Sequence, residues 1–163
     1  MGAKLQFLGG YQDGCFEVNP STLAYVQGQP LKFNTTGQLE LCLCYREGHD
    51  DGYCGLAKGW SGSHTDKLSD IYNGKATYWA GFNQMKLDTT DPRNENDDYP
   101  YETVVTYNEG DDIYINDLGQ LTNIGPGGSS GYADVCDDAT PIAYVIAIPP
   151  TGPQVWIVIN QVR

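Results

Sequence analysis

The side chains that could do chemistry in this sequence are five cysteines, two histidines and 21 carboxylates. The densest group comprises Cys42, Cys44, His49 and Cys54, whose thiolate and imidazole donors are ligands that Zn²⁺ prefers. Structural zinc sites usually separate paired cysteines by two to four residues, whereas one residue separates Cys42 from Cys44. We therefore favour small, half-buried thiols over a zinc centre.

The number and context of the cysteines bear on their redox state. Their odd count and the lack of an apolar signal sequence in the first residues both favour reduced thiols. Segment 38–45 alternates in polarity, so Cys42 and Cys44 would lie on one face of a strand, which is poor geometry for a disulfide between them. We expect the cysteines, which also include Cys15 and Cys136, to be reduced.

No catalytic motif stands out. His49 and His64 lie in glycine-rich, polar stretches typical of loops, and there is no Gly-x-Ser-x-Gly elbow, phosphate-binding loop, HExxH or CxxC pattern. We therefore expect a protein that is not an enzyme and that carries no cofactor or resident metal. A hydrolase with paired carboxylates is a distant alternative, which a raised carboxyl pKa inside a concave pocket would support.

Two further alternatives concern ligands. The acidic stretch 88–98 is dense in oxygen ligands, yet it lacks the order of an EF-hand, so we favour a solvated loop over a calcium site. Three tryptophans and twelve tyrosines could form a sugar-binding platform, with Trp60 and Tyr101 as its candidates. Trp79 and Trp156 lie inside strand patterns and are expected to be core or interface anchors. A carbohydrate- or receptor-binding β module of a virion or cell surface is thus the alternative function.

The composition of the 163 residues sets the fold class. Twenty glycines, nine prolines and twelve tyrosines suit many short strands joined by tight turns, and predict an all-β protein with little helix. The net charge of −12 argues against a nucleic-acid partner and against an anionic membrane surface. The longest apolar run, 142–148, is far shorter than the roughly 20 residues of a membrane-spanning helix.

A pattern of turn and apolar residues occurs twice, 82 residues apart. Segments 28–39 and 110–121 are identical at five of twelve positions, and each contains an Asn-x-x-Gly turn between apolar pairs. Asn34 with Gly37, and Asn116 with Gly119, have the chemistry of type I turns that close hairpins with a left-handed glycine. The repeat predicts a duplicated β-hairpin unit.

The rest of the chain divides around the acidic stretch. We expect an N-terminal β lobe over 1–87, an acidic linker over 88–100 and a C-terminal β lobe over 101–163, with one continuous domain as the alternative. Segment 65–72 carries the one helical hint. The other predicted strands cover 5–8, 24–26, 53–58, 75–82, 102–107, 142–148 and 154–162.

The last two predicted strands are apolar on both faces. Ile142, Tyr144, Ile146 and Ile148 would face one way and the alternate residues the other, and segment 154–162 behaves similarly. Both faces of such strands must be covered. Either the strands are central in a sandwich or their outer face is a subunit interface, which favours an oligomer.

The repeated motifs resemble a known family. Gly28-x-x-Leu-x-Phe-Asn-x-x-Gly-Gln-Leu39 with Gly-x-Cys-Gly-Leu-Ala57, and Gly110-Asp-x-Ile-Tyr-Ile-Asn-x-x-Gly-Gln-Leu-Thr122 with Pro141-Ile-Ala-Tyr-Val-Ile146, resemble capsid decoration (cement) proteins of tailed bacteriophages. The resemblance covers about a third of the chain. Ala143 stands where the family has glycine, and the acidic linker and the cysteine cluster have no family counterpart.

The resemblance implies an antiparallel β-barrel, tulip-like or sandwich fold and a non-enzymatic, structural role. Such a protein is made in the host cytoplasm, binds the outer surface of the virion as a homotrimer, and stabilises contacts between major capsid proteins. The candidate interface residues lie in the N-terminal segment and the last two strands: Lys4, Leu5, Phe7, Leu8, Tyr144, Ile146, Trp156 and Val158.

Overall fold

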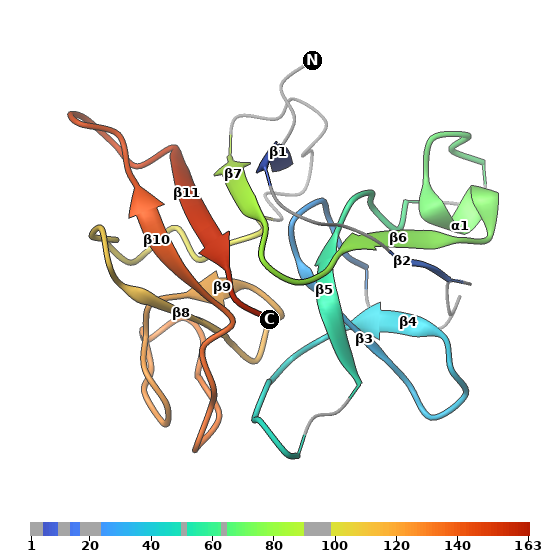
Figure 1. Ribbon diagram of the computed structural model, residues 1–163, viewed down its shortest axis with the longest axis horizontal. Helices are drawn as coiled ribbons and strands as arrows, with labels where there is room; N and C mark the ends of the chain where they lie inside the picture. Colours follow the sequence, from blue (N-terminus) through green and yellow to red (C-terminus); the bar gives the residue numbers. More distant parts are fainter. Residues whose placement is uncertain (1–4, 10–13, 17–23, 50–51, 63–64, 90–98) are drawn as a thin grey trace.

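The computed structural model describes residues 5–9, 14–16, 24–49, 52–62, 65–89 and 99–163, and in them nearly all of the regular secondary structure is β-strand (Figure 1). The predicted all-β fold is confirmed. The elements are β1 (Leu5–Gly9), β2 (Gly14–Phe16), β3 (Pro30–Phe33), β4 (Leu39–Leu41), β5 (Tyr53–Ala57), α1 (Asp70–Asn73), β6 (Ala76–Trp79), β7 (Gln84–Asp88), β8 (Asp112–Ile115), β9 (Leu121–Thr122), β10 (Ala143–Ala147) and β11 (Trp156–Gln161).

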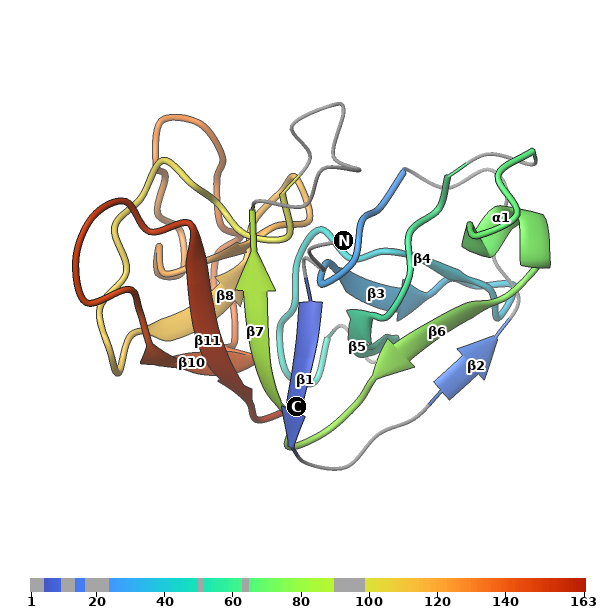
Figure 2. The same cartoon turned by 90° about the horizontal axis from the view of Figure 1, so that it is seen from above.

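The strands form two curled antiparallel sheets. One has six strands in the order β1-β7-β11-β10-β8-β9, and the other has five in the order β2-β6-β5-β3-β4. Figure 2 shows β7 and β1 side by side between the remaining strands of the two sheets. The six-stranded sheet therefore takes strands from both sides of the acidic stretch.

The two sheets repeat one strand order. If β2 to β6 and β7 to β11 are each numbered one to five, both sheets run 1-5-4-2-3, and β1 is added beside β7. Identical order in two consecutive halves is the structural mark of an internal duplication. We call β2–β6 the first unit and β7–β11 the second unit.

The hairpins formed by the second and third strands of the two units, β3–β4 and β8–β9, match in detail. In each, an asparagine side-chain oxygen accepts from the backbone N–H four residues later, at 3.0 Å from Gln38 and 2.9 Å from Gln120. The glycine N–H donates to the carbonyl of the same asparagine at 3.0 Å in both turns. Gly37 and Gly119 adopt φ values of 81° and 71°, which favour glycine.

The duplication extends beyond the hairpins. Gly28 and Gly110 share a φ of 91°, and their N–H groups donate to the carbonyls of Ala57 and Val145, which belong to the fourth strand of each unit. Three residues earlier lie Tyr25 and Tyr107, each 1% exposed. The correspondence of strand order, turns and buried tyrosines confirms the predicted pair of related hairpin units and enlarges it.

The hydrophobic core spans both sheets. The larger cluster joins Leu56 of β5, and Cys42 directly after β4, to residues of the six-stranded sheet such as Leu87, Ile113 and Ile157. A second cluster lies within the first unit around Leu31 and Tyr78. The two units thus pack on a shared apolar interior.

Several predicted elements differ from the structure. Segments 24–26 and 102–107 contain no strand; their buried residues fill the core from irregular backbone, as Tyr25, Glu102 and Tyr107 do. The helix is shorter than 65–72, because Ser69 caps its start and Gly74, with φ of 66°, ends it. Strands β2 and β7 were not predicted.

The alternation predicted for 142–148 is interrupted. The register shifts between Val145 and Ala147, so that Val145 lies opposite Ile159 and Ala147 opposite Val158. A bulge at this point puts Ala147 on the other face from Val145. This is why the expected grouping of alternate residues fails beyond Val145.

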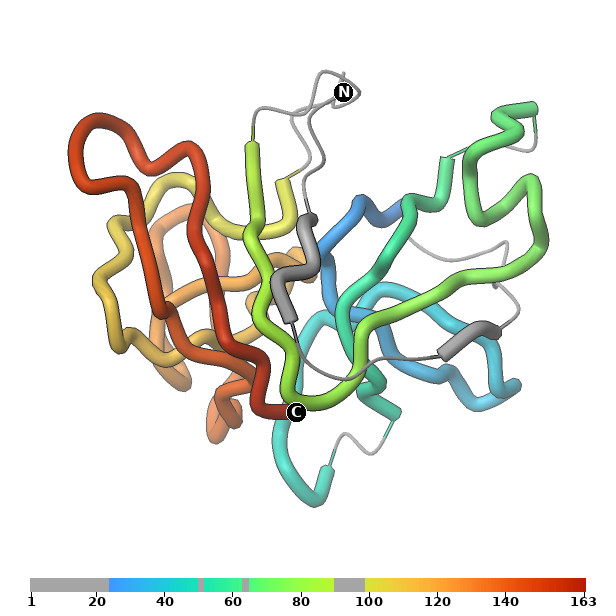
Figure 3. The backbone as a smooth tube through the Cα atoms, turned by 45° about the horizontal axis from the view of Figure 1, so that its top comes forward, coloured from blue at the N-terminus to red at the C-terminus, as the bar shows by residue number. Residues whose placement is uncertain are grey.

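The C-terminal end of the chain lies at the junction of the two units. The backbone N–H of Gln161 donates to Asn83 at 2.7 Å, and its side chain donates to Trp79 at 2.9 Å. The C-terminus consequently lies beside the link between β6 and β7 (Figure 3). On the other side, the Gln29 side chain donates to Gly119 at 2.9 Å, which ties the first unit to the second hairpin.

Candidate functional site

The first candidate surface is the outer face of the six-stranded sheet. Tyr144 of β10 is 38% exposed, Trp156 and Ile146 are half-buried, and Val158 is 9% exposed. Since Val145, Ile157 and Ile159 point into the core, Tyr144, Trp156 and Val158 point away from it. We call the group Tyr144, Ile146, Trp156 and Val158 the apolar strip.

Charged and polar residues border the apolar strip. The Lys86 ammonium of β7 lies 5.0 Å from the centre of the Trp156 ring, within cation–π range. Of the N-terminal interface candidates, Lys4 lies outside the described residues. Leu5 and Phe7 belong to β1, where their backbones lie opposite Leu87 and Met85, and Leu8 lies in the same strand.

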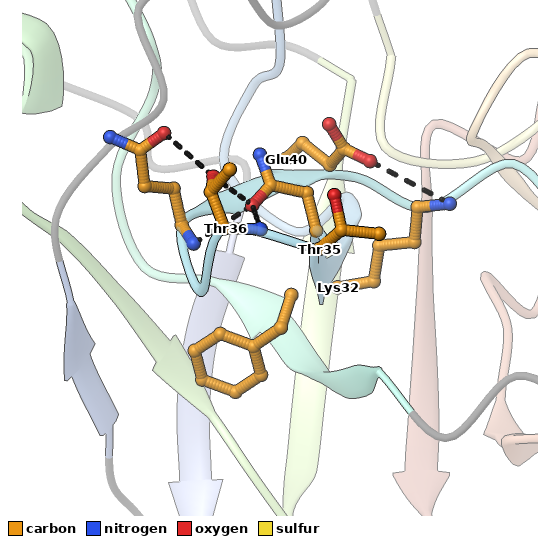
Figure 4. Close-up of a pocket in the computed structure, with 7 residues that line it drawn as sticks. Lys32, Thr35, Thr36 and Glu40 are labelled. Carbon is orange, nitrogen blue, oxygen red and sulfur yellow. Dashed lines mark hydrogen bonds and ion pairs between the residues drawn. The ribbon is translucent and has the colours of Figure 1, made fainter.

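A second candidate is an open hollow of about 590 Å³ along the first hairpin (Figure 4). The Lys32 ammonium lies 3.7 Å from a Glu40 carboxylate oxygen, and the Thr36 hydroxyl donates to Asn34 at 2.7 Å. These polar groups satisfy one another and are open to solvent, where ion pairs contribute little. We assign the hollow no chemistry. It is lined by Lys32, Phe33, Asn34, Thr35, Thr36, Gln38 and Glu40.

The cysteines correct one prediction. Cys44 and Cys136 form a disulfide with a Cα–Cα distance of 6.1 Å, so the expectation of reduced thiols is wrong for this pair. The partners lie 92 residues apart and meet only because the two units pack together, which spacing along the sequence does not reveal. The buried Cys42 thiol donates to the Cys44 carbonyl at 3.0 Å, and Cys54 is a free thiol.

The proposed metal sites find no support in the described part of the chain. Cys44 forms the disulfide and His49 is exposed, so Cys42, Cys44, His49 and Cys54 do not form the zinc site considered from the sequence. Within the described ranges no group of three His, Cys, Asp or Glu side chains could hold a metal. Residues 90–98 of the calcium candidate, and His64, lie outside those ranges.

The tryptophan and tyrosine platform is not assembled. Tyr101 is 1% exposed, and its hydroxyl donates to the Gln154 carbonyl at 3.0 Å, so it is a core residue. Trp60 is half-buried, and its indole N–H donates to Asp66 at 3.1 Å. Trp79 is packed against the core beneath the Lys58 ammonium, at 4.2 Å. Trp60 and Tyr101 therefore do not form a shared exposed platform for a sugar.

One buried carboxyl was missed by the sequence. Asp70 is 9% exposed, and the Tyr25 hydroxyl donates to it at 2.7 Å. Burial raises the pKa of Asp70 to about 6, although the hydrogen bond from Tyr25 acts in the opposite direction. Its buried polar partner is a tyrosine rather than a second carboxylate, so it does not form the paired-carboxylate site of a hydrolase.

We expect this carboxyl to make the protein more stable as the pH falls from 7 to 4. The folded pKa of about 6 exceeds the usual 3.8, so between these values the folded state binds more protons and its stability declines with rising pH. Because the carboxyl is partly solvated, the effect is about 1–2 kcal/mol. Urea unfolding of the wild type and Asp70→Asn across this pH range measures the difference. Parallel pH profiles for the two proteins would contradict it.

A third candidate is a smaller cavity of about 200 Å³ where the units meet. Its walls come from loops of both units. The tyrosines considered as a sugar platform include Tyr99 and Tyr132, but the sequence did not bring these residues together as one site. The cavity is lined by Ala24, Gln29, Tyr99, Leu118, Gln120 and Tyr132.

Comparison of the sequence with known proteins assigns no function to these surfaces. No helix of the described residues is long and apolar enough to cross a membrane. No protein-family model matches the sequence. No curated protein matches it at a significant level.

Proposed function

We propose that this protein is a non-enzymatic structural protein that binds the outer surface of a phage capsid and stabilises contacts between major capsid proteins. The observation that carries the proposal is the apolar strip. Its side chains belong to β10 and β11, the two strands that follow the second hairpin in the chain, and Tyr144 is 38% exposed. Partly exposed aromatic residues are typical of protein interfaces.

The charge and the disulfide support the same function. A chain of net charge −12 does not compete for packaged DNA, because it repels phosphate. The Cys44–Cys136 disulfide suits a virion surface, where oxidising conditions preserve such bonds. A partner that binds only the assembled shell stabilises it by the free energy of that binding.

We further propose that the protein acts as a homotrimer whose subunits contact one another and the major capsid protein through the apolar strip and β1. In a trimer, weak contacts repeated over the capsid lattice add by multivalency. Light scattering is expected to give a mass three times the 17.9 kDa of the chain, unchanged by EDTA. A strict monomer would contradict the trimer.

Replacing Tyr144 by alanine should weaken capsid binding at least tenfold, because truncating a central interface aromatic costs roughly 2 kcal/mol. The measurement is co-sedimentation of the purified chain with expanded heads of the phage whose genome encodes it. Tyr72→Ala is the matched control, since Tyr72 of α1 is 47% exposed and lies outside the apolar strip. Equal binding by both variants would remove the apolar strip from the interface, and no binding by the wild type would overturn the proposed function.

A further inference from the structure

The cavity where the two units meet has the features of a ligand site. It measures about 200 Å³, below the range of roughly 300–1,000 Å³ typical of drug-sized ligands, so it suits a single small ring. Gln29 precedes β3 in the first unit, whereas Tyr99, Leu118, Gln120 and Tyr132 belong to the second. The site therefore exists only when the two units are packed together.

A buried amide supplies a hydrogen-bond acceptor in this cavity. Gln120 is 8% exposed, and its side-chain N–H donates to the Tyr99 carbonyl at 3.3 Å, which fixes the amide. Its Oε1 atom is buried and accepts no hydrogen bond from the described residues. An unsatisfied buried acceptor costs about 1–3 kcal/mol, so a ligand that donates a hydrogen bond here would recover that energy.

The second amide of the cavity is already engaged. Gln29 is 5% exposed; its side-chain oxygen accepts from Val26 N–H at 2.9 Å, and its side-chain N–H donates to Gly119. Gln29 thus holds the second hairpin in place beside the cavity. Of the two amide oxygens, Gln120 Oε1 is the one that accepts no hydrogen bond from the described residues.

The remaining walls are aromatic and aliphatic. Tyr132 is 59% exposed, Leu118 is 43% exposed and Tyr99 is half-buried. A tyrosine ring offers an apolar face for the C–H groups of a ring ligand and a hydroxyl for its polar edge. Large exposed side chains grouped around a cavity are more typical of a binding site than of a bare surface.

The charge of the site narrows the ligand class. None of the six lining residues carries a charge, so nothing in the cavity neutralises an anion or a cation. The net charge of −12 further disfavours anions. What remains is a neutral ligand with hydroxyl donors on a compact ring.

We propose that the cavity between the units binds a neutral sugar ring of a glycan, with Gln120 Oε1 accepting from a sugar hydroxyl and Tyr132 packing on the ring. This gives the protein a carbohydrate-binding site separate from the apolar strip. The proposal does not depend on capsid binding, since the two sites share no residue.

The test combines a glycan array with ligand-observed NMR titrations of methyl hexopyranosides and N-acetylhexosamines. We expect the wild type to bind at least one neutral sugar, and Tyr132→Ala and Gln120→Met each to weaken that binding at least tenfold. Tyr132 is largely exposed, so its truncation leaves the fold intact, which circular dichroism checks. Tyr72→Ala, another exposed tyrosine, should bind like the wild type.

Three outcomes would overturn the proposal. They are failure of the wild type to bind any neutral glycan on the array, retention of wild-type binding by Tyr132→Ala, and preferential binding of inorganic phosphate or anionic sugars. Co-sedimentation with phage heads of the Tyr132→Ala variant separates the two functions. Loss of sugar binding with normal capsid binding supports independent sites, and loss of both contradicts them.

Discussion

Removing the disulfide is expected to lower the free energy of unfolding by about 4 kcal/mol, because the bond closes a loop with a sequence separation of 92 and restricts the unfolded chain. The variant is Cys44→Ser/Cys136→Ser, which leaves no unpaired partner behind. Urea unfolding measures the change. A reductant should lower the stability of the wild type by a similar amount and leave that of the double variant unchanged.

Cys54→Ser is the matched control for this experiment. The Cys54 thiol is free and donates to the Leu31 carbonyl at 3.2 Å, a bond that a serine hydroxyl can replace. We expect its stability to stay within about 1 kcal/mol of the wild type, and its response to reductant to match the wild type. If Cys44→Ser/Cys136→Ser were as stable as Cys54→Ser, packing alone would hold the two units together.

The fold was predictable where local chemistry decides it. Asn34 with Gly37, and Asn116 with Gly119, mark the hairpin turns through their own backbone preferences. Alternating apolar residues mark β3 and β8, and apolar runs mark β10 and β11. The strand β7 was not predicted, because its alternation of polar and apolar residues in 84–88 is only five residues long. Its place between β1 and β11 depends on pairing with distant strands.

In segment 102–107 the sequence predicted a strand that the structure does not contain. Val104, Val105 and Tyr107 read as a strand, yet Val104 is 62% exposed and Tyr107 is 1% exposed. The Tyr107 hydroxyl donates to the Glu102 carbonyl at 2.8 Å, so the segment folds back on itself. Tertiary packing overrides β propensity here, since this segment fills the core by single side chains rather than by a ladder.

The apolar strip and the cavity between the units differ in how far the sequence predicted them. The apolar strip was suggested by residues on adjacent predicted strands, and its function as an interface stays a prediction. The cavity was invisible in the sequence, because Ala24, Tyr99 and Tyr132 lie in loops far apart in the chain. Gln120 follows the second turn as Gln38 follows the first, so the sequence does not distinguish them; tertiary packing buries Gln120, at 8% exposure, and leaves Gln38 half-buried.

The duplication allows the same substitution to be compared at two equivalent turns. Gly119→Ala should cost about 3–4 kcal/mol of stability, combining left-handed strain with overpacking. Gly119 has φ of 71°, and a Cβ atom there would lie 2.5 Å from Cγ of Leu41, which is 7% exposed. Gly37→Ala meets the same strain at φ of 81° but nothing within 4 Å, and should cost about 1–2 kcal/mol.

Urea unfolding of the two variants isolates the contact between the units, because the turn strain is common to both and cancels in the difference. Truncating Leu41 makes the assignment specific. In the Gly119→Ala background, Leu41→Ala should cost at least about 1 kcal/mol less than in the wild type, since it removes the clash while opening the same cavity. Equal costs for Gly37→Ala and Gly119→Ala would mean that the second turn moves freely, and that Gly119 does not fix the packing of the second hairpin on β4.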